Sequence, residues 1–231
     1  MDDLIETKEG FSGNLGISLN GQSGNKDEQE YSIDSVLRYS ENSNIFVLLG
    51  DYNYSKTNDI RDEDELFLHA RWVNLNFFKP SLDSEVFTQY QYDDFADLSN
   101  RTLIGANIRW RQDLLFEADK SQFILGAGAF LEREESEQTN LSETLVRANL
   151  YARYLHQEDG EYPFSFFFSA YVQPAVEDVS DLRSLVVTGI EFPIRPSLSI
   201  GFDIEVKHNS TPFSDVEKTD IDYGVTLKYS F

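Results

Sequence analysis

The 231-residue chain contains no cysteine, one methionine and three histidines. The lack of cysteine excludes disulfide bonds, thiol nucleophiles and thiolate metal sites. His69, His156 and His208 are too few for a centre built from several histidine ligands. No run of about 18 apolar residues occurs, so no transmembrane helix is predicted. We therefore predict no metal site and no cofactor.

Positive charge is also scarce. The 19 Lys and Arg residues face 41 Asp and Glu residues, which gives a formal net charge of −22. This charge argues against nucleic acid as a partner, because phosphate binding needs a basic patch. It is compatible with a membrane if the charges lie in loops. The start, MDDLIETKEG, is acidic and polar and does not resemble a signal peptide, and the single methionine, Met1, indicates a start residue added to a mature or engineered chain.

Apolar and aromatic residues instead follow a period of two. In the last segment, DYGVTLKYSF, every second residue is apolar or aromatic: Tyr223, Val225, Leu227, Tyr229 and Phe231. Such alternation is typical of β-strands with two different faces. We expect twelve strands, with a bulge in the fourth, at 11–22, 30–40, 44–56, 65–78, 84–93, 101–112, 121–132, 144–156, 163–175, 182–194, 197–209 and 219–231.

The length and the charge of these strands favour a membrane barrel over a soluble sandwich. Strands of soluble proteins average about five or six residues, whereas a tilted membrane strand needs about nine to eleven. Backbone groups in hydrocarbon must all be paired, so the sheet has to close. The predicted fold is an all-β, twelve-stranded antiparallel transmembrane β-barrel of the outer-membrane type. We expect a short periplasmic segment at 1–10, one barrel domain at 11–231, and both termini on the periplasmic side.

The connections and the aromatic residues fit this orientation. Polar, acidic connections such as KTNDIRDED are expected at the outer end, and shorter turns such as FEADK at the inner end. The acidic residues of the outer loops are read as solvated, with a cation bridge to lipopolysaccharide phosphates as an alternative. Aromatic girdles at the two membrane interfaces would contact lipid and are expected to include Tyr39, Tyr52, Tyr54, Tyr90, Tyr92, Trp110 and Tyr154.

The polar face of the strands would line the lumen. The expected lining residues are Asp34, Arg38, Arg109, Arg111, Arg147, Arg153, Asp203, Glu205, Asp222 and Lys228. One interpretation is a narrow passive channel for small polar solutes or ions, whose selectivity these charges set. The alternative is a structural or stress-induced barrel that salt bridges hold shut. Twelve strands lie between filled eight-stranded barrels and open sixteen-stranded ones, so width does not decide between them.

A third hypothesis is enzymatic. Ser210 lies two residues after His208 at the outer end of a strand, an arrangement that resembles outer-membrane lipid hydrolases. Asp222 could orient the imidazole, but the alternation turns Asp222 inward. A strand exit is rich in such residues for ordinary reasons, so we predict that the protein is not an enzyme. The glycines Gly126 and Gly128 are expected to make room for a bulky neighbour or for a bend in the barrel wall rather than to bind a nucleotide.

Several short segments resemble known sequences. The alternating final strand, with Phe231 at its end, resembles the signal by which the barrel assembly machinery recognises its substrates. The pieces GNLGISLNGQSGN, FILGAGAFLERE, NLYARY, YVQP, DVSDLR and EKTDIDYGVTLKYSF resemble the salt-induced outer-membrane proteins of the domain of unknown function 481. That resemblance implies an outer-membrane barrel and names no substrate.

Overall fold

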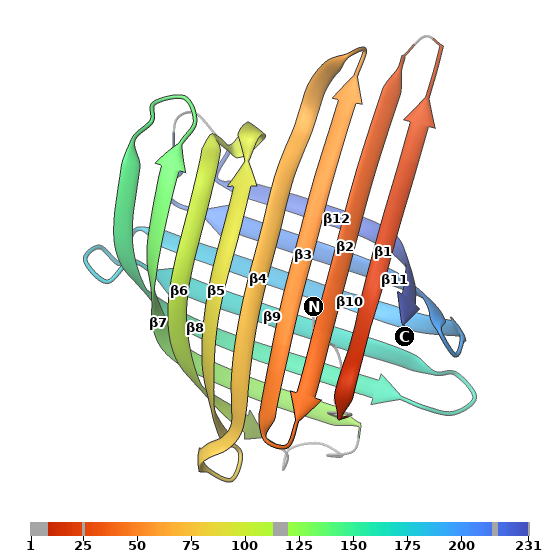
Figure 1. Ribbon diagram of the computed structural model, residues 1–231, viewed down its shortest axis with the longest axis vertical. Helices are drawn as coiled ribbons and strands as arrows, with labels where there is room; N and C mark the ends of the chain where they lie inside the picture. The colour runs from red at the N-terminus through yellow and green to blue at the C-terminus, as the bar shows by residue number, and fades with distance from the viewer. Residues whose placement is uncertain (1–8, 25, 113–119, 214–216, 231) are drawn as a thin grey trace.

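The computed structural model describes residues 9–24, 26–112, 120–213 and 217–230. Twelve antiparallel strands pair in chain order, and β1 pairs with β12, so the sheet forms a closed barrel (Figure 1). The strands are β1 (Gly10–Gln22), β2 (Glu28–Glu41), β3 (Asn44–Thr57), β4 (Ile60–Lys79), β5 (Leu82–Asp93), β6 (Leu98–Gln112), β7 (Ser121–Ser136), β8 (Ser142–Glu158), β9 (Phe164–Pro174), β10 (Leu182–Arg195), β11 (Leu198–Asn209) and β12 (Thr219–Ser230).

The fold and the twelve predicted strands are confirmed. In the described residues the one helical element is the 3-10 turn η1 (Asp94–Ala96), and no helix is long and apolar enough to cross a membrane. The predicted irregularity in the fourth strand is present, because the pairing of β4 with β5 shifts between Asn74 and Lys79.

The prediction of a loop at KTNDIRDED is wrong. β3 continues to Thr57 and β4 begins at Ile60, so the connection is a tight turn at Asn58 and Asp59, both with positive φ. The two strands remain paired up to this turn because hydroxyl groups form hydrogen bonds with an acidic side chain of the hairpin. Thr57 Oγ1 donates to Asp62 Oδ2 over 2.7 Å, and the Ser55 hydroxyl donates to the other oxygen of the same carboxylate. Residues 116–119 of the predicted turn FEADK lie outside the described residues.

The connections define two ends of the barrel. At the loop end lie the described residues 23–24, 26–27, 58–59, 94–97, 137–141, 175–181, 210–213 and 217–218. At the turn end lie the described residues 42–43, 80–81, 120, 159–163 and 196–197. The longest fully described connection, 175–181, belongs to the loop end. Of the four two-residue turns, 42–43, 80–81 and 196–197 belong to the turn end and 58–59 to the loop end.

The two faces of the wall differ as the alternation predicts, with one correction. Outward residues such as Phe46 and Leu48 are exposed, whereas Ile45 and Val47, which alternate with them along β3, are buried. The interior is therefore not wholly polar. Ile45, Val47 and Val73 form one apolar cluster near the turn end, and Phe87, Leu103 and Phe130 form a second. His69 also lies inside the barrel, where its ring stacks on Phe67 and Phe87.

Aromatic side chains form a band around the turn end of the outward face. The rings of Phe11, Tyr39, Phe46 and Trp72 follow one another across β1 to β4 with centroid distances of 4.7, 6.5 and 6.2 Å. Nearer the loop end, Tyr31 and Tyr54 lie 6.1 Å apart. Of the other predicted girdle residues, Tyr90 and Trp110 are exposed, and Tyr52, Tyr92 and Tyr154 are half-buried.

Glycine is needed where the wall packs tightly against its own interior. A Cβ on Gly126 would lie 2.1 Å from the Tyr151 ring, which agrees with the predicted role of this glycine in making room for a bulky neighbour. A Cβ on Gly128 would lie 2.0 Å from the backbone oxygen of Ala106, which cannot move without distorting β6. A Cβ on Gly201, by contrast, would meet nothing closer than 3.9 Å.

We expect Gly128→Ala to lower the free energy of unfolding by about 1–3 kcal/mol, because the added methyl overpacks a wall that cannot yield. Gly201→Ala is the matched control and should change stability by less than about 0.5 kcal/mol. Urea unfolding of the refolded barrel in lipid vesicles measures both. Equal stability of the two variants would contradict the packing shown here.

Candidate functional site

The charged side chains of the wall meet inside the barrel. Tyr151 of β8 donates through its hydroxyl to Glu85 of β5 over 3.3 Å. Arg183 Nη2 of β10 lies 2.6 Å from Glu134 Oε2 of β7. Strands β8 and β5, and strands β10 and β7, are not neighbours in the sheet. Their side chains can therefore touch only through the interior, and the polar face of the strands is the inward face.

A cluster near the loop end joins β6, β7, β8 and β10. We call it the loop-end arginine cluster, and it comprises Arg101, Arg147, Arg183, Glu132, Glu134 and Asp181. Both Arg101 and Arg147 form short ion pairs with Glu132, and Arg147 also binds Asp181 over 2.9 Å. Its three guanidinium groups meet three carboxylates, so the cluster is balanced in charge. Because Asp181 lies in the 175–181 connection, the cluster also ties that connection to the barrel wall.

A second polar network lies further toward the turn end. Glu85 accepts a hydrogen bond from Asn107 Nδ2 over 2.6 Å, and Arg109 Nη1 lies 3.6 Å from the same carboxylate. Arg71 Nη1 is 3.9 Å from it. The network extends to β8, where Asn149 Nδ2 donates to Asn107 Oδ1 over 3.1 Å. It is also buried, so this half of the lumen is filled by hydrogen-bonded side chains.

The remaining predicted basic residues lie in the same interior. Arg153 is buried, Arg111 pairs with Asp83 over 2.8 Å, and Lys228 pairs with Glu191 over 3.0 Å. Arg38 is buried and donates from Nε to Ser40 over 3.1 Å. The prediction missed several inward charges, which share the strand parity of the predicted ones: Arg71, Glu85, Arg101, Glu132, Glu134 and Arg183. Counting in steps of two from Arg109 would have found Arg101, and counting from Gly128 would have found Glu132 and Glu134.

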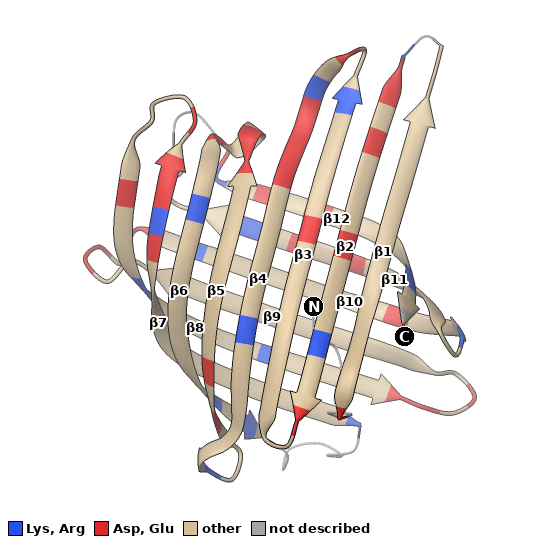
Figure 2. Ribbon diagram, viewed as in Figure 1, with Lys and Arg blue, Asp and Glu red and all other residues tan. Residues whose placement is uncertain are grey.

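The opposite part of the lumen is acidic. Seven of the inward carboxylates of β2, β3, β4, β11 and β12 form what we call the acidic wall: Asp34, Asp51, Glu63, Glu65, Asp203, Glu205 and Asp222. Asp34 stands directly opposite Asp51, and Glu205 directly opposite Asp222. Like charges in such positions repel. Figure 2 shows acidic residues gathered along the loop-end halves of β2, β3 and β4.

Few cations balance the acidic wall in the described residues. Lys207 lies 3.0 Å from Glu205 and 3.5 Å from Asp222. No salt bridge between described residues involves Asp34, Asp51 or Asp203. The lumen is therefore divided into a side where arginines and carboxylates pair and a side where carboxylates predominate.

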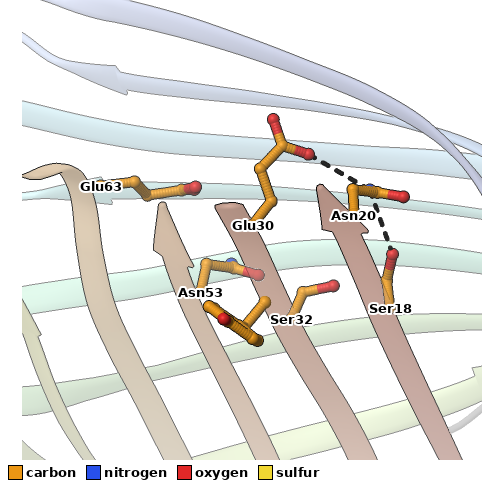
Figure 3. Close-up of a pocket in the computed structure, with 7 residues that line it drawn as sticks. Ser18, Asn20, Glu30, Ser32, Asn53 and Glu63 are labelled. Carbon is orange, nitrogen blue, oxygen red and sulfur yellow. Dashed lines mark hydrogen bonds between the residues drawn. The ribbon is translucent and has the colours of Figure 1, made fainter. Parts of the chain in front are cut away.

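A polar cavity of about 250 Å³ lies along the acidic wall, toward the loop end (Figure 3). Its lining comes from four consecutive strands: Ser18, Asn20, Glu30, Tyr31, Ser32, Asn53 and Glu63. Asn20 Nδ2 donates to Glu30 Oε2 over 3.2 Å, and Asn53 Nδ2 donates to Glu65 Oε1 over 2.7 Å. These oxygens and amides suit a ligand with hydroxyl groups or a positive charge.

The structure does not assemble His208 and Ser210 into a catalytic pair. The Ser210 hydroxyl donates to the Ser180 carbonyl oxygen over 2.9 Å and accepts from the Leu182 backbone N–H over 2.7 Å. His208 Nδ1 instead lies 2.8 Å from Thr219 Oγ1. Asp222 faces the acidic wall and lies near Lys207. Each polar group at this strand exit thus holds neighbouring chain segments together. Among the described residues, no group of three or more His, Asp or Glu side chains could hold a metal ion.

A closed antiparallel wall, apolar and aromatic outside and charged inside, defines a transmembrane β-barrel of the outer-membrane type. The chain belongs to the family described as "Protein of unknown function, DUF481", whose model matches residues 15–231. This membership confirms the resemblance found in the sequence. A search of curated protein sequences finds no match.

Solved structures with similar folds include outer-membrane barrels of low sequence identity. The NanC porin is 6% identical, with a TM-score of 0.52 over 94% of this chain and 98% of that chain. The translocator domain of the autotransporter NalP from Neisseria meningitidis is 11% identical, with a TM-score of 0.49 over 97% and 90%. The β domain of the Bordetella autotransporter BrkA is 9% identical, with a TM-score of 0.45 over 96% and 97%. At this identity the likeness concerns the fold alone.

We expect Glu132→Gln to destabilise the barrel by about 3–5 kcal/mol, because it removes a carboxylate shared by buried guanidinium groups and leaves their charge uncompensated. Lys207→Met is the comparison, since Lys207 is half-exposed and its pairs should contribute less than about 1 kcal/mol. Denaturant unfolding in lipid vesicles measures both changes. A loss for Glu132→Gln no larger than that for Lys207→Met would show that the loop-end arginine cluster does not hold the wall together.

Proposed function

We propose that this protein resides in the bacterial outer membrane, with both termini on the periplasmic side, and forms a narrow passive channel for small polar solutes and ions. The proposed channel prefers cations. Its path runs along the acidic wall, and the arginine side of the lumen serves mainly as a structural filling.

The unequal pairing of charge across the lumen carries this proposal. On one side, the three arginines of the loop-end arginine cluster meet three carboxylates, so their charges cancel locally. On the other side, Asp34, Asp51 and Asp203 point inward without a described ion-pair partner. A lumen lined by one sign of charge within low-dielectric walls concentrates ions of the opposite sign. The acidic wall should therefore attract cations and repel anions.

The repulsion within the acidic wall supports a functional role for it. Asp34 and Asp51 are directly opposite each other, an arrangement in which two like charges repel and which therefore costs stability. A barrel that needed only to be stable would lose nothing if either were neutral. Rings and rows of carboxylates are the usual means by which cation channels select ions.

A barrel without an open pore is the second candidate. The observation that favours it is the buried network in which Tyr151 and Asn149 of β8 reach Glu85 of β5 and Asn107 of β6. This network narrows the lumen from one side. If it met the opposite wall, the protein would be a sealed structural barrel.

Planar-bilayer recording distinguishes the two candidates. In a KCl gradient we expect current steps with a cation-selective reversal potential, and Asp34→Asn with Asp51→Asn should move that potential toward zero because two inward charges are lost. Glu137→Gln with Glu177→Gln, an equal loss of two charges on exposed connections, should leave the reversal potential unchanged.

An absence of current in the native protein, and also in Arg109→Ala with Arg147→Ala, would favour the sealed barrel. Anion selectivity in the native protein would contradict the proposed role of the acidic wall. In either case the double asparagine variant should fold at least as well as the native chain, since it relieves a like-charge contact.

Membrane lipid, lipopolysaccharide and the barrel assembly machinery are the proposed partners. Tyr223, Val225, Leu227 and Tyr229 are exposed along the outward face of β12, as a lipid-facing final strand requires. Phe231, the last residue of the proposed assembly signal, lies outside the described residues. We assign no catalysis to Ser210, because both hydrogen bonds of its hydroxyl hold a neighbouring connection.

Deleting Phe231 should lower the amount of inserted, heat-modifiable barrel in cells far more than Phe213→Ala, because the assembly machinery would read the terminal aromatic residue. The measurement is the yield of folded protein in outer-membrane fractions. Equal yields of the two variants would count against a terminal recognition signal.

A further inference from the structure

The barrel is closed by a short stretch of pairing between its first and last strands. β1 pairs with β2 along its whole length, from Gly10 opposite Ser40 to Gln22 opposite Glu28. With β12, in contrast, the described residues of β1 pair only where Asn14 faces Ser230 and Leu15 faces Tyr229. From Gly16 to Gln22, β1 has no strand partner on this side among the residues that the structure describes. The two strands diverge from their contact toward the loop end (Figure 1).

We call this divergence the seam, bounded by 16–22 of β1 and 219–228 of β12. Side-chain exposure marks it independently of the pairing. Outward residues in the fully paired wall, such as Leu48 and Leu150, are 47% and 50% exposed. At the seam, Leu19 is 70% and Tyr223 is 83% exposed. These side chains lack a neighbouring strand on one side.

The inward residues of the seam are exposed as well. Ser18 and Asn20 point into the lumen, yet both are exposed, whereas the inward Asn107 and Ser169 elsewhere in the wall are buried. The side chain of Asp222, across the seam on β12, is 64% exposed. The lumen therefore communicates with the surroundings of the barrel through the seam.

An open seam is costly in a membrane. Unpaired backbone N–H and C=O groups in hydrocarbon cost several kcal/mol each, so strand edges are normally closed or covered. The seam has an apolar outer rim, formed by Ile17, Leu19, Ile221 and Tyr223, and a polar inner rim formed by Ser18, Asn20 and Asp222. A molecule that occupies it needs an apolar part on the lipid side and polar groups on the lumen side.

The polar cavity lies directly behind this rim. Ser18 and Asn20 belong both to the seam edge of β1 and to the cavity lining, and Glu30 and Glu63 lie deeper in the cavity (Figure 3). A group entering through the seam would therefore meet the Ser18 hydroxyl, the Asn20 amide and the Asp222 carboxylate at the rim, and the carboxylates of Glu30 and Glu63 behind them. This order suits a headgroup with hydroxyls or a positive charge and opposes an anionic headgroup.

We propose that the seam is a lateral portal between the lumen and the membrane for an amphipathic molecule with a cationic, hydroxyl-bearing headgroup. Its headgroup occupies the cavity at Ser18, Asn20, Glu30 and Glu63, and its hydrocarbon chain passes between β1 and β12 into the lipid. This role goes beyond axial conduction of small solutes and does not require it, because the lateral path depends on the seam and the axial path on the whole lumen.

The first experiment asks whether the seam is open, and the absence of cysteine makes it direct. If β1 and β12 continued to pair in the register of Asn14 with Ser230, Ser18 would stand opposite Thr226. Ser18→Cys with Ser32→Cys is the control, because these two residues are paired across β1 and β2. In lipid vesicles under mild oxidation we expect a disulfide in the control and none in Ser18→Cys with Thr226→Cys. Equal disulfide yields would overturn the proposal.

The second experiment asks what enters. A bimane fluorophore is attached to the variant Asn20→Cys, and the protein is placed in lipid vesicles. The vesicles contain one of two single-chain amphiphiles, a hexadecylammonium or a hexadecyl phosphate, each with a nitroxide quencher at its headgroup. We expect stronger quenching by the cationic amphiphile than by the anionic one, and loss of this preference in Glu30→Gln with Glu63→Gln. A fluorophore at Gln89→Cys, inside the wall at β5, should stay unquenched.

Two further results, one from each experiment, would also overturn the proposal. Quenching at position 20 no stronger than at position 89 would mean that amphiphiles do not enter. Intermolecular disulfides in the single variant Ser18→Cys would mean that the edge of β1 pairs with a second copy of the chain instead. Because none of these readouts measures current, a failure here leaves the conduction experiment intact, and the reverse also holds.

Discussion

The requirement that backbone polar groups be paired in a medium without water determines the architecture of this protein. Strands as long as β4 and β8 can cross hydrocarbon only if every neighbour is another strand, and this condition closes the sheet. Closure in turn fixes the two environments of the wall. Apolar and aromatic side chains lie outside, and the charged side chains lie in the lumen and at both ends of the barrel.

Inside the closed wall, charge has to be either neutralised or exposed to water. The loop-end arginine cluster follows the first course, with Glu132 shared between Arg101 and Arg147. The acidic wall follows the second, because Asp34 and Asp51 lie side by side on neighbouring strands and point into a lumen whose acidic side contains a polar cavity. The two halves of one interior thus serve different purposes. One half stabilises the barrel, and the other creates the field that a permeating ion would experience.

The same pairing requirement is least satisfied at the seam. The two residue pairs described between β1 and β12 close the circle near the turn end, and the strands separate toward the loop end. The seam joins the lipid to a cavity whose lining is polar and acidic. Axial conduction and lateral entry, if both operate, would therefore share the acidic wall, so charge changes at Glu63 bear on both.

The sequence by itself determined the class of fold, the strands and the side of the wall on which most residues lie, because a period of two is a local property that each strand records independently. Arg109, Arg147 and Arg153 could be placed on the polar face from that period alone. Local alternation carries no information about distance across the barrel. It could not pair Arg183 with Glu134, place the apolar residues Phe87 and Phe130 inside, or turn KTNDIRDED into a hairpin. Only the tertiary structure decided which charges meet, which carboxylates lie without an ion-pair partner and where the circle of strands is weakly closed, since each depends on curvature and stagger summed over all twelve strands.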